Sequence, residues 1–169
     1  TIFQYTLSTG YDLSTATYDN VSFAVGTEDT LVLSMEFCAD GTKLFVLGFG
    51  NKSVFQYSLS TGFDLSTASY DSVSFLVSGE TNAPYSVTFN SDGSKMYVLG
   101  NGTDEIVLQY SLSTAYDIST ASYDSVSFDV GAQNGDVRSI AFTPDGTKMY
   151  ILGSSGSHIY QYALSTAFD

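Results

Sequence analysis

Apolar and polar residues alternate along short stretches of this chain, with the spacing of strands rather than of helices. Between positions 54 and 99, alternation or short apolar runs predict strands over residues 54–60, 73–77, 86–89 and 95–99. The pair Asp92-Gly93 separates the last two strands, and such a pair predicts a tight hairpin because glycine accepts a positive φ. No stretch has helical periodicity over a useful length. The pattern therefore predicts an all-β protein.

The same pattern returns about every fifty residues. The Gln-Tyr segments that mark it are anchored at Gln4, Gln56, Gln109 and Gln161, which are 52, 53 and 52 positions apart. The Asp-Gly hairpin recurs in each full copy, at positions 40–41, 92–93 and 145–146. A fixed period of this size is typical of repeat architectures, in which each unit buries its apolar faces against its neighbours. Each unit is expected to be a four-stranded antiparallel meander.

Three hairpin segments carry a family resemblance. Residues 37–46, 89–98 and 142–151 share the pattern Phe-x-x-Asp-Gly-x-Lys-Met/Leu-Tyr/Phe-Val/Ile. They resemble the inner hairpin of bacterial β-propeller blades of the YVTN type, and the Gln-Tyr-x-Leu-Ser segments resemble the third strand of such blades. The resemblance implies a propeller fold. It lies in blade-forming residues, so it implies little about activity.

In the register of such blades, the chain divides into a partial blade at 1–25, blades at 33–77 and 85–130, and a partial blade at 138–169. A β-trefoil or β-prism is the alternative fold, because it also uses three repeats of about four strands. The terminal partial blades would expose unpaired strand edges, which proteins usually cover. The chain is therefore expected either to be an excerpt of a longer array or to associate with further copies of itself.

Charge and hydropathy exclude two classes of partner. Eighteen acidic and five basic residues give a net charge of −13, which repels phosphate backbones and anionic lipid. No apolar run approaches the roughly 20 residues of a membrane helix. We therefore expect neither nucleic-acid binding nor membrane insertion. Cys38 is the only cysteine, and its apolar surroundings predict a small buried side chain.

Propeller geometry sorts the loops onto two faces. One face would carry the Asp-Gly turns and the long Ser-Thr-rich loops, which barely vary between copies. The other would carry loops that differ in every copy, and variable loops are where recognition usually occurs. The predicted binding residues on this variable face are Glu28, Asp29, Glu80, Asn82, Asp104, Glu105 and Asp136.

The long constant loop also contains carboxylates, such as Asp64 and Asp71 in the second copy. These side chains can accept backbone hydrogen bonds and fix the turn, or together with hydroxyls they can hold a hard cation such as calcium. No Asp-x-Asp-x-Asp spacing exists, so no metal site or cofactor is expected, with calcium kept as the alternative. The repeated glutamine is expected to tie neighbouring blades together.

The sequence contains few residues of the kinds that form catalytic sites. His158 is the only histidine and Arg138 the only arginine, and no nucleophile–base set or phosphate-cradling loop can be assembled. We therefore expect no enzyme, but a structural repeat protein that self-associates into a fibre, appendage or array on an extracellular, cell or virion surface. The first alternative is an adhesion module that binds a glycan or another cell-surface ligand. The second follows from the resemblance alone, since some propellers of this kind are lactonases or metal-dependent hydrolases.

Overall fold

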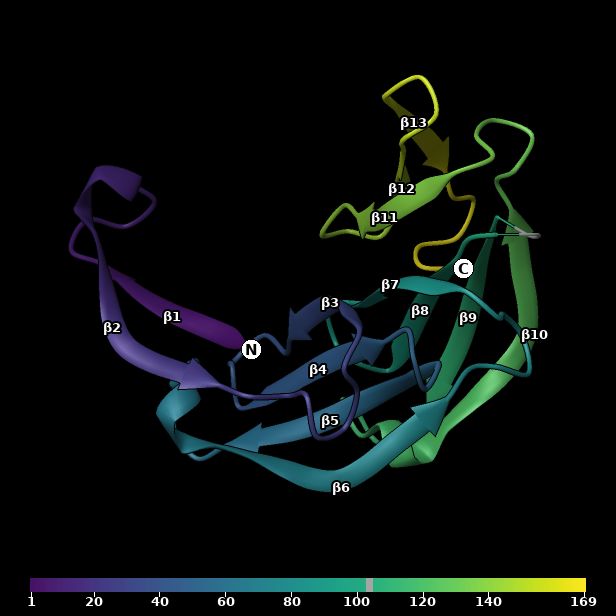
Figure 1. Ribbon diagram of the computed structural model, residues 1–169. Helices are drawn as coiled ribbons and strands as arrows, with labels where there is room; N and C mark the ends of the chain where they lie inside the picture. Colours follow the sequence, from purple (N-terminus) through teal and green to yellow (C-terminus); the bar gives the residue numbers. More distant parts are fainter. Residues whose placement is uncertain (103–104) are drawn as a thin grey trace.

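The computed structural model describes residues 1–102 and 105–169, and in these residues all the regular structure except three short 3₁₀ turns consists of β-strands (Figure 1). The strands form four antiparallel sheets in chain order, which we call blades 1 to 4. Blade 1 contains β1 (Ile2–Leu7) and β2 (Ala16–Phe23). Blade 2 contains β3 (Val32–Phe37), β4 (Lys43–Gly48), β5 (Ser53–Leu59) and β6 (Ala68–Leu76). Blade 3 contains β7 (Pro84–Phe89), β8 (Lys95–Gly100), β9 (Ile106–Leu112) and β10 (Ala121–Asp129), and blade 4 contains β11 (Val137–Phe142), β12 (Lys148–Gly153) and β13 (His158–Ala163).

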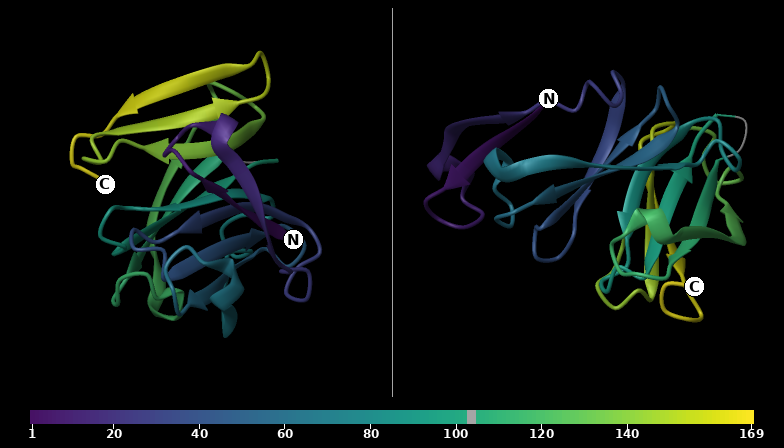
Figure 2. Two further views of the ribbon diagram at one scale, coloured as in Figure 1. Left: turned by 90° about the vertical axis from the view of Figure 1, so that its left-hand side faces the viewer. Right: turned by 90° about the horizontal axis from the view of Figure 1, so that it is seen from below.

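The blades are arranged radially. Their first strands lie side by side, β3 against β7 and β7 against β11, while the fourth strands lie on the outside (Figure 1). Blades 1 and 4 lie at opposite ends of the row (Figure 2). This all-β, propeller-like arrangement confirms the predicted class, and it differs from the threefold globule of the β-trefoil or β-prism alternative.

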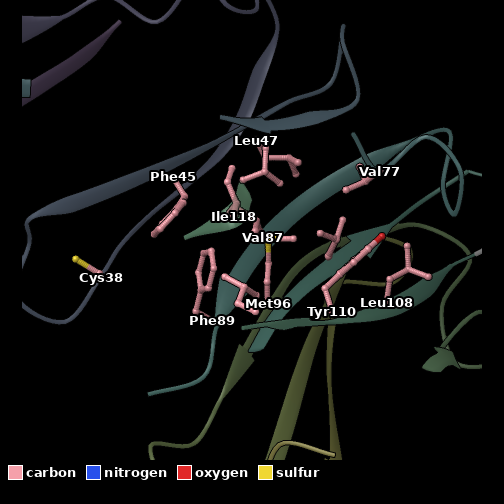
Figure 3. Close-up of a cluster of buried hydrophobic side chains, with 13 residues drawn as sticks. Cys38, Phe45, Leu47, Val77, Val87, Phe89, Met96, Leu108, Tyr110 and Ile118 are labelled. Atoms are coloured by element: carbon pink, nitrogen blue, oxygen red, sulfur yellow. The ribbon is translucent and has the colours of Figure 1, made fainter. Parts of the chain in front are cut away.

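Over the part of the chain that the structure describes, the core consists of three clusters, one between each pair of neighbouring blades. Between blades 2 and 3, Phe45 of β4 packs against Phe89 of β7 with ring centroids 4.3 Å apart, and Met96 and Tyr110 are fully buried beside them (Figure 3). The other two interfaces contain equivalent residues. Blades 2 and 3 therefore bury apolar side chains on both faces, as the repeat pattern predicted, whereas blades 1 and 4 do so on the face that meets a neighbour.

The long constant loop is more ordered than the sequence indicated. In each copy it forms a 3₁₀ turn, at Leu13–Thr15 (η1), Leu65–Thr67 (η2) and Ile118–Thr120 (η3). The fourth strand then begins at once, so β6 starts at Ala68 rather than near residue 73. A bulge between Gln56 and Tyr57 in the pairing of β5 with β6 accommodates the early start, and Ser72 in the bulge has a φ of 58°. The sequence pattern did not predict the first residues of β6, because a bulge interrupts the alternation that identifies a strand.

Candidate functional site

The loops separate onto two faces as predicted. On the constant face, the N–H of Phe63 in the long loop donates to the carbonyl of Gly41 in the Asp-Gly turn, at 3.0 Å. On the variable face, the N–H of Asn51 in the β4–β5 loop donates to Asp29 in the loop that joins blades 1 and 2, at 2.6 Å. Each face therefore has its own set of packed loops.

Asp29, one of the predicted binding residues, is 4% exposed and helps to build the variable face. Its carboxylate accepts from the backbone N–H groups of Leu31 and Asn51, at 2.7 and 2.6 Å. A Cβ at Gly48 would lie 2.3 Å from this carboxylate, so glycine is needed there. Asp29 therefore fixes the entry to blade 2 and presents no free carboxylate to a ligand.

Glu28 and Glu80 also hold loops in place. Glu28 accepts from the hydroxyl of Tyr57 at 3.2 Å, and Glu80 accepts from that of Tyr110 at 3.4 Å. Burial, and then the nearby glutamate, raise the pKa of each tyrosine well above its ordinary value of 10. Both glutamates thus act within the fold as acceptors for buried phenols.

The other predicted residues lie on separate loops. Asn82 is exposed between β6 and β7, Glu105 is half-buried just before β9, and Asp104 lies outside the described residues. None of the described contacts brings Asn82 and Glu105 together. Their role in binding stays a prediction.

Asp136 takes part in a contact that joins blades 3 and 4. It accepts from the Nδ2 of Asn101 at 2.9 Å, from the hydroxyl of Ser154, and from the Nη2 of Arg138 at 2.9 Å. The bonds from Ser154 and Asn101, more than the charge of Arg138, lower the pKa of the Asp136 carboxyl. Sequence reasoning did not pair Asp136 with Arg138, although their spacing of two residues could have suggested it.

Arg138 also lies over the ring of Tyr85, with 5.0 Å between its Cζ and the ring centroid. Tyr85 in turn meets Phe49 edge-to-face, with centroids 5.8 Å apart. The guanidinium is thus flanked by an aromatic face and neutralised by Asp136. This cluster links blades 2, 3 and 4 and leaves no surplus positive charge for an anionic ligand.

A different acidic residue, Glu36, lies in a concave part of the surface. It lies on β3, and it lines a hollow of about 310 Å³ together with residues from blades 3 and 4. Burial raises the pKa of Glu36 above its ordinary value of 4.5. The hollow's walls are apolar and hydroxyl-bearing: Thr88, Phe89, Ser91, Ile140, Ala141, Phe142, Thr143, Pro144 and Phe168.

Sequence reasoning missed Glu36 because it lies within an apolar strand, between Met35 and Phe37. A comparison of the repeats could nevertheless have identified Glu36. The equivalent positions in the first strands of blades 3 and 4 are Thr88 and Ala141, so an acid occurs at this inner position only in blade 2. The three first strands bring these positions to the same hollow.

The constant loop shows the turn-fixing role of its carboxylates. Asp64 caps η2 by accepting from the N–H and the hydroxyl of Ser66, at 3.0 and 2.7 Å. Asp71 has other partners, namely Lys43 and Gln56, each at 2.8 Å. Among the described residues, no three His, Cys, Asp or Glu side chains gather in a way that could hold a metal ion. Calcium binding stays untested.

The repeated glutamine ties neighbouring blades, as predicted. Gln4 donates to Asp19 in its own blade at 2.9 Å and accepts from the N–H of Leu65 in blade 2 at 2.8 Å. No helix within 1–102 and 105–169 has the length and apolar character to cross a membrane.

The fold and its inter-blade contacts define a protein of the β-propeller class. Among solved structures, the chain is similar to a candidate 6-phosphogluconolactonase from Bacteroides uniformis, with a TM-score of 0.58 and 17% identity over 79% of this chain and 37% of that one. It is also similar to a protein of unknown function from Desulfotomaculum acetoxidans (TM-score 0.60, 17% identity, 89% of this chain and 44% of that one). A luciferin-regenerating enzyme matches with a TM-score of 0.58 and 16% identity over 80% of this chain and 45% of that one. The chain thus spans less than half the length of these structures.

No family model matches the sequence, and no curated protein matches it. The structural matches contradict the expectation of a non-catalytic surface array or adhesion module. Two of the three solved proteins that share the blade arrangement have names of enzymes, and none is named as a fibre or adhesion protein. The resemblance to blades of the YVTN type stays a prediction.

Proposed function

We propose that this chain is part of a β-propeller hydrolase that opens a lactone or a similar small ester. One observation carries the proposal: Glu36, whose pKa is raised by burial, lines a hollow to which three blades contribute. A carboxyl with a perturbed pKa in a concave site is a candidate general acid or base. The names of two structural neighbours, a candidate 6-phosphogluconolactonase and a luciferin-regenerating enzyme, support a small-molecule hydrolase.

The finer architecture belongs to the same proposal. Blades 2 and 3 are complete four-stranded units, whereas blades 1 and 4 contribute two and three strands. The solved neighbours are more than twice as long as the part matched. We infer that the working protein is a closed ring in which the two terminal sheets are completed, because a closed ring leaves only short, protected strand edges.

The chemistry would proceed as follows. Glu36 as a carboxylate removes a proton from a water molecule, whose oxygen attacks the ester carbonyl carbon. The carbon–oxygen bond of the ester then breaks, and the protonated Glu36 returns its proton to the departing oxygen, which gives an acid and an alcohol. A raised pKa suits this exchange because it brings the carboxyl closer to the operating pH. The hydroxyls of Thr88 and Ser91 in the hollow's wall are available to orient the substrate.

Turnover of a panel of aldonolactones and small esters tests this proposal. The wild-type chain is expected to hydrolyse at least one member, and Glu36→Gln is expected to lower kcat by at least about 100-fold, as loss of general acid–base catalysis typically does. Glu28→Gln is the matched control, because its amide oxygen can still accept from Tyr57. Absence of turnover across the panel, or an unchanged kcat in Glu36→Gln, would refute the proposal.

A further inference from the structure

Ser91 is a polar departure from an otherwise repeated turn. It lies in the Asp-Gly turn after β7 and lines the same hollow as Glu36, which we call the Glu36 hollow. The equivalent residues in the turns of blades 2 and 4 are Ala39 and Pro144. Among the three Asp-Gly turns, only that of blade 3 therefore carries a hydroxyl at this position.

The hydroxyl of Ser91 is free to bind a ligand. Ser91 is exposed, and none of the hydrogen bonds among the described residues uses its hydroxyl. Thr143, by contrast, donates its own hydroxyl to Asp145 at 2.6 Å. The hydroxyl of Thr88 is also unused there, but Thr88 lies on the face of β7 opposite to Phe89, and Phe89 packs towards blade 2. Ser91 is thus the free hydroxyl that the turn itself presents to the hollow.

Glu36 is directed towards the first strand of blade 3. Alternate residues of a strand lie on the same face, so Glu36 shares a face of β3 with Ser34 and Cys38. The hydroxyl of Ser34 accepts from the N–H of Val87 on β7 at 3.4 Å, and Cys38 is buried in the cluster between blades 2 and 3. The carboxyl and Ser91 therefore approach the hollow from neighbouring blades.

Tyr116 holds the turn of Ser91 from behind. Its hydroxyl donates to the backbone carbonyls of Ser91 and Asn90, at 3.1 and 3.3 Å. Its ring packs near Phe45 and Phe89, with centroids 6.3 and 5.7 Å away. Burial, more than the acidic groups nearby, raises the pKa of Tyr116 above 10, so its hydroxyl keeps the proton and remains a donor.

The hydroxyl of Tyr116 is not needed for packing. Its equivalents in blades 2 and 4 are Phe63 and Phe168, and each of these rings lies over the glycine of its own Asp-Gly turn, as Tyr116 lies over Gly93. A phenyl ring is therefore sufficient to cover the turn. Among the blades that have this turn, only blade 3 adds the hydroxyl, and the same blade carries Ser91.

We propose that Ser91 stabilises the oxyanion in the ester hydrolysis assigned to Glu36, and that Tyr116 is a positioning residue that holds Ser91 in place. This inference rests on the proposed function, because it names a second group in the same hollow. Tyr116 does not line the Glu36 hollow, so it acts through Ser91.

The step balances without a further reactant. As the oxygen of water bonds to the carbonyl carbon, the π electrons of the carbonyl move onto its oxygen, and the O–H of Ser91 donates to that oxygen. When the carbon–oxygen bond of the ester breaks, those electrons re-form the carbonyl, and Ser91 keeps its proton. A donor that is already held in place stabilises the charge without reorganisation.

Steady-state kinetics on the best substrate from the panel of aldonolactones and small esters test the role of Ser91. Ser91→Ala is expected to lower kcat at least about 10-fold with KM changed less than about threefold, because a bond made only in the transition state is lost. Ser91→Thr keeps a hydroxyl and is expected to retain at least about a third of the wild-type kcat. Ser119→Ala is the matched control, because it removes an exposed hydroxyl that bonds only within η3, to Asp117.

A double variant tests the role of Tyr116. Tyr116→Phe places in blade 3 the ring that blades 2 and 4 already have, so it should fold, and circular dichroism checks that it does. It is expected to lower kcat at least about threefold, because the donor is less well positioned. Tyr116→Phe combined with Ser91→Ala is expected to be no slower than Ser91→Ala alone, since Tyr116 acts through Ser91.

The outcomes separate this inference from the proposed function. If Glu36→Gln abolishes turnover but Ser91→Ala leaves kcat unchanged, this inference is overturned while the proposed function stands. Ser91→Thr as slow as Ser91→Ala would also overturn it, because the hydroxyl would then not be the active group. Losses that multiply in the double variant would overturn the positioning role of Tyr116. A wild-type chain without turnover on the whole panel would refute the proposed function, and this inference with it.

Discussion

The side-chain oxygen of Gln56 accepts a hydrogen bond from the backbone N–H of Ile118, 62 positions further along the chain, at 2.9 Å. The nitrogen of the same amide donates to Asp71 within its own blade, at 2.8 Å. One side chain thus fixes the geometry within a blade and the position of the next blade. Because the amide has both a donor and an acceptor, this one side chain can make both contacts at once.

Gln56→Ala is expected to lower the free energy of unfolding by about 1–3 kcal/mol, because the N–H of Ile118 remains buried without its acceptor. Urea denaturation followed by tyrosine fluorescence measures the change. Gln161→Ala, at the exposed equivalent on β13, should change stability by less than about 0.5 kcal/mol. Equal losses in both variants would show that the amide does not link blades.

Gly93→Ala is expected to destabilise the protein by about 2–4 kcal/mol. Gly93 has a φ of +73°, and an added Cβ would lie 2.3 Å from the ring of Tyr116, so strain and overpacking both oppose the alanine. Gly79→Ala is the control, because its Cβ would meet nothing within 4 Å and its φ is not in the left-handed region. Thermal denaturation should therefore show a lower Tm for the first variant only. A Tm for Gly93→Ala that equals the control's would contradict this packing.

The pKa of Asp40 should be measurable as an acid-stability effect. Bonds from the hydroxyl and N–H of Thr42, and then from the thiol of Cys38, lower the pKa of Asp40 from 3.8 to about 2. Because the folded state binds this proton less readily, its stabilisation is present above pH 3.8 and is lost as the pH falls towards 2.

Thr42→Val is expected to move the pKa of Asp40 back towards 3.8 and to reduce that acid-dependent loss, as carboxyl ¹³C chemical shifts during a pH titration would show. Thr17→Val, at an exposed position on β2, is the control and should leave the titration unchanged. An unaltered Asp40 titration in Thr42→Val would mean that the turn's hydroxyl is not its partner.

Glu36 should make the stability of the protein depend on pH in the opposite sense to Asp40. Its pKa is raised above 4.5 by burial, so the folded state holds this proton more tightly than the unfolded state. The contribution to stability is full below pH 4.5 and is lost as the pH rises through the folded-state pKa. Urea midpoints at pH 4, 6 and 8 should therefore show a flatter pH profile for Glu36→Gln than for the wild type or Glu28→Gln. Identical profiles in all three proteins would argue against a perturbed carboxyl.

Local pattern was sufficient to predict the strands, the Asp-Gly hairpins and the sorting of loops onto two faces. The repeated glutamine was also predicted to link blades, since a polar residue that returns in every copy between aromatic positions needs a partner that returns as well. The start of β6 was not predicted, because the bulge at Ser72 breaks the alternation.

The predicted binding residues show the limit of this reasoning. Asp29 was selected because its loop varies between copies, but its neighbours in space turn its carboxylate towards backbone N–H groups. Glu36 was overlooked because an apolar strand usually signals only burial. The residues around Glu36, such as Thr88 and Ala141, belong to later blades. The apolar pattern of a single strand therefore cannot predict them.

The sequence by itself determined the unit: its strands, its turns and the apolar faces that must be covered. Those properties depend on residues close together in the chain, which a period of about fifty positions repeats. Only the tertiary structure decided which carboxylates accept hydrogen bonds from the backbone, as Asp29 does, and which one lies in a hollow, as Glu36 does. These outcomes depend on contacts between blades, where desolvation and packing are set by side chains distant in sequence.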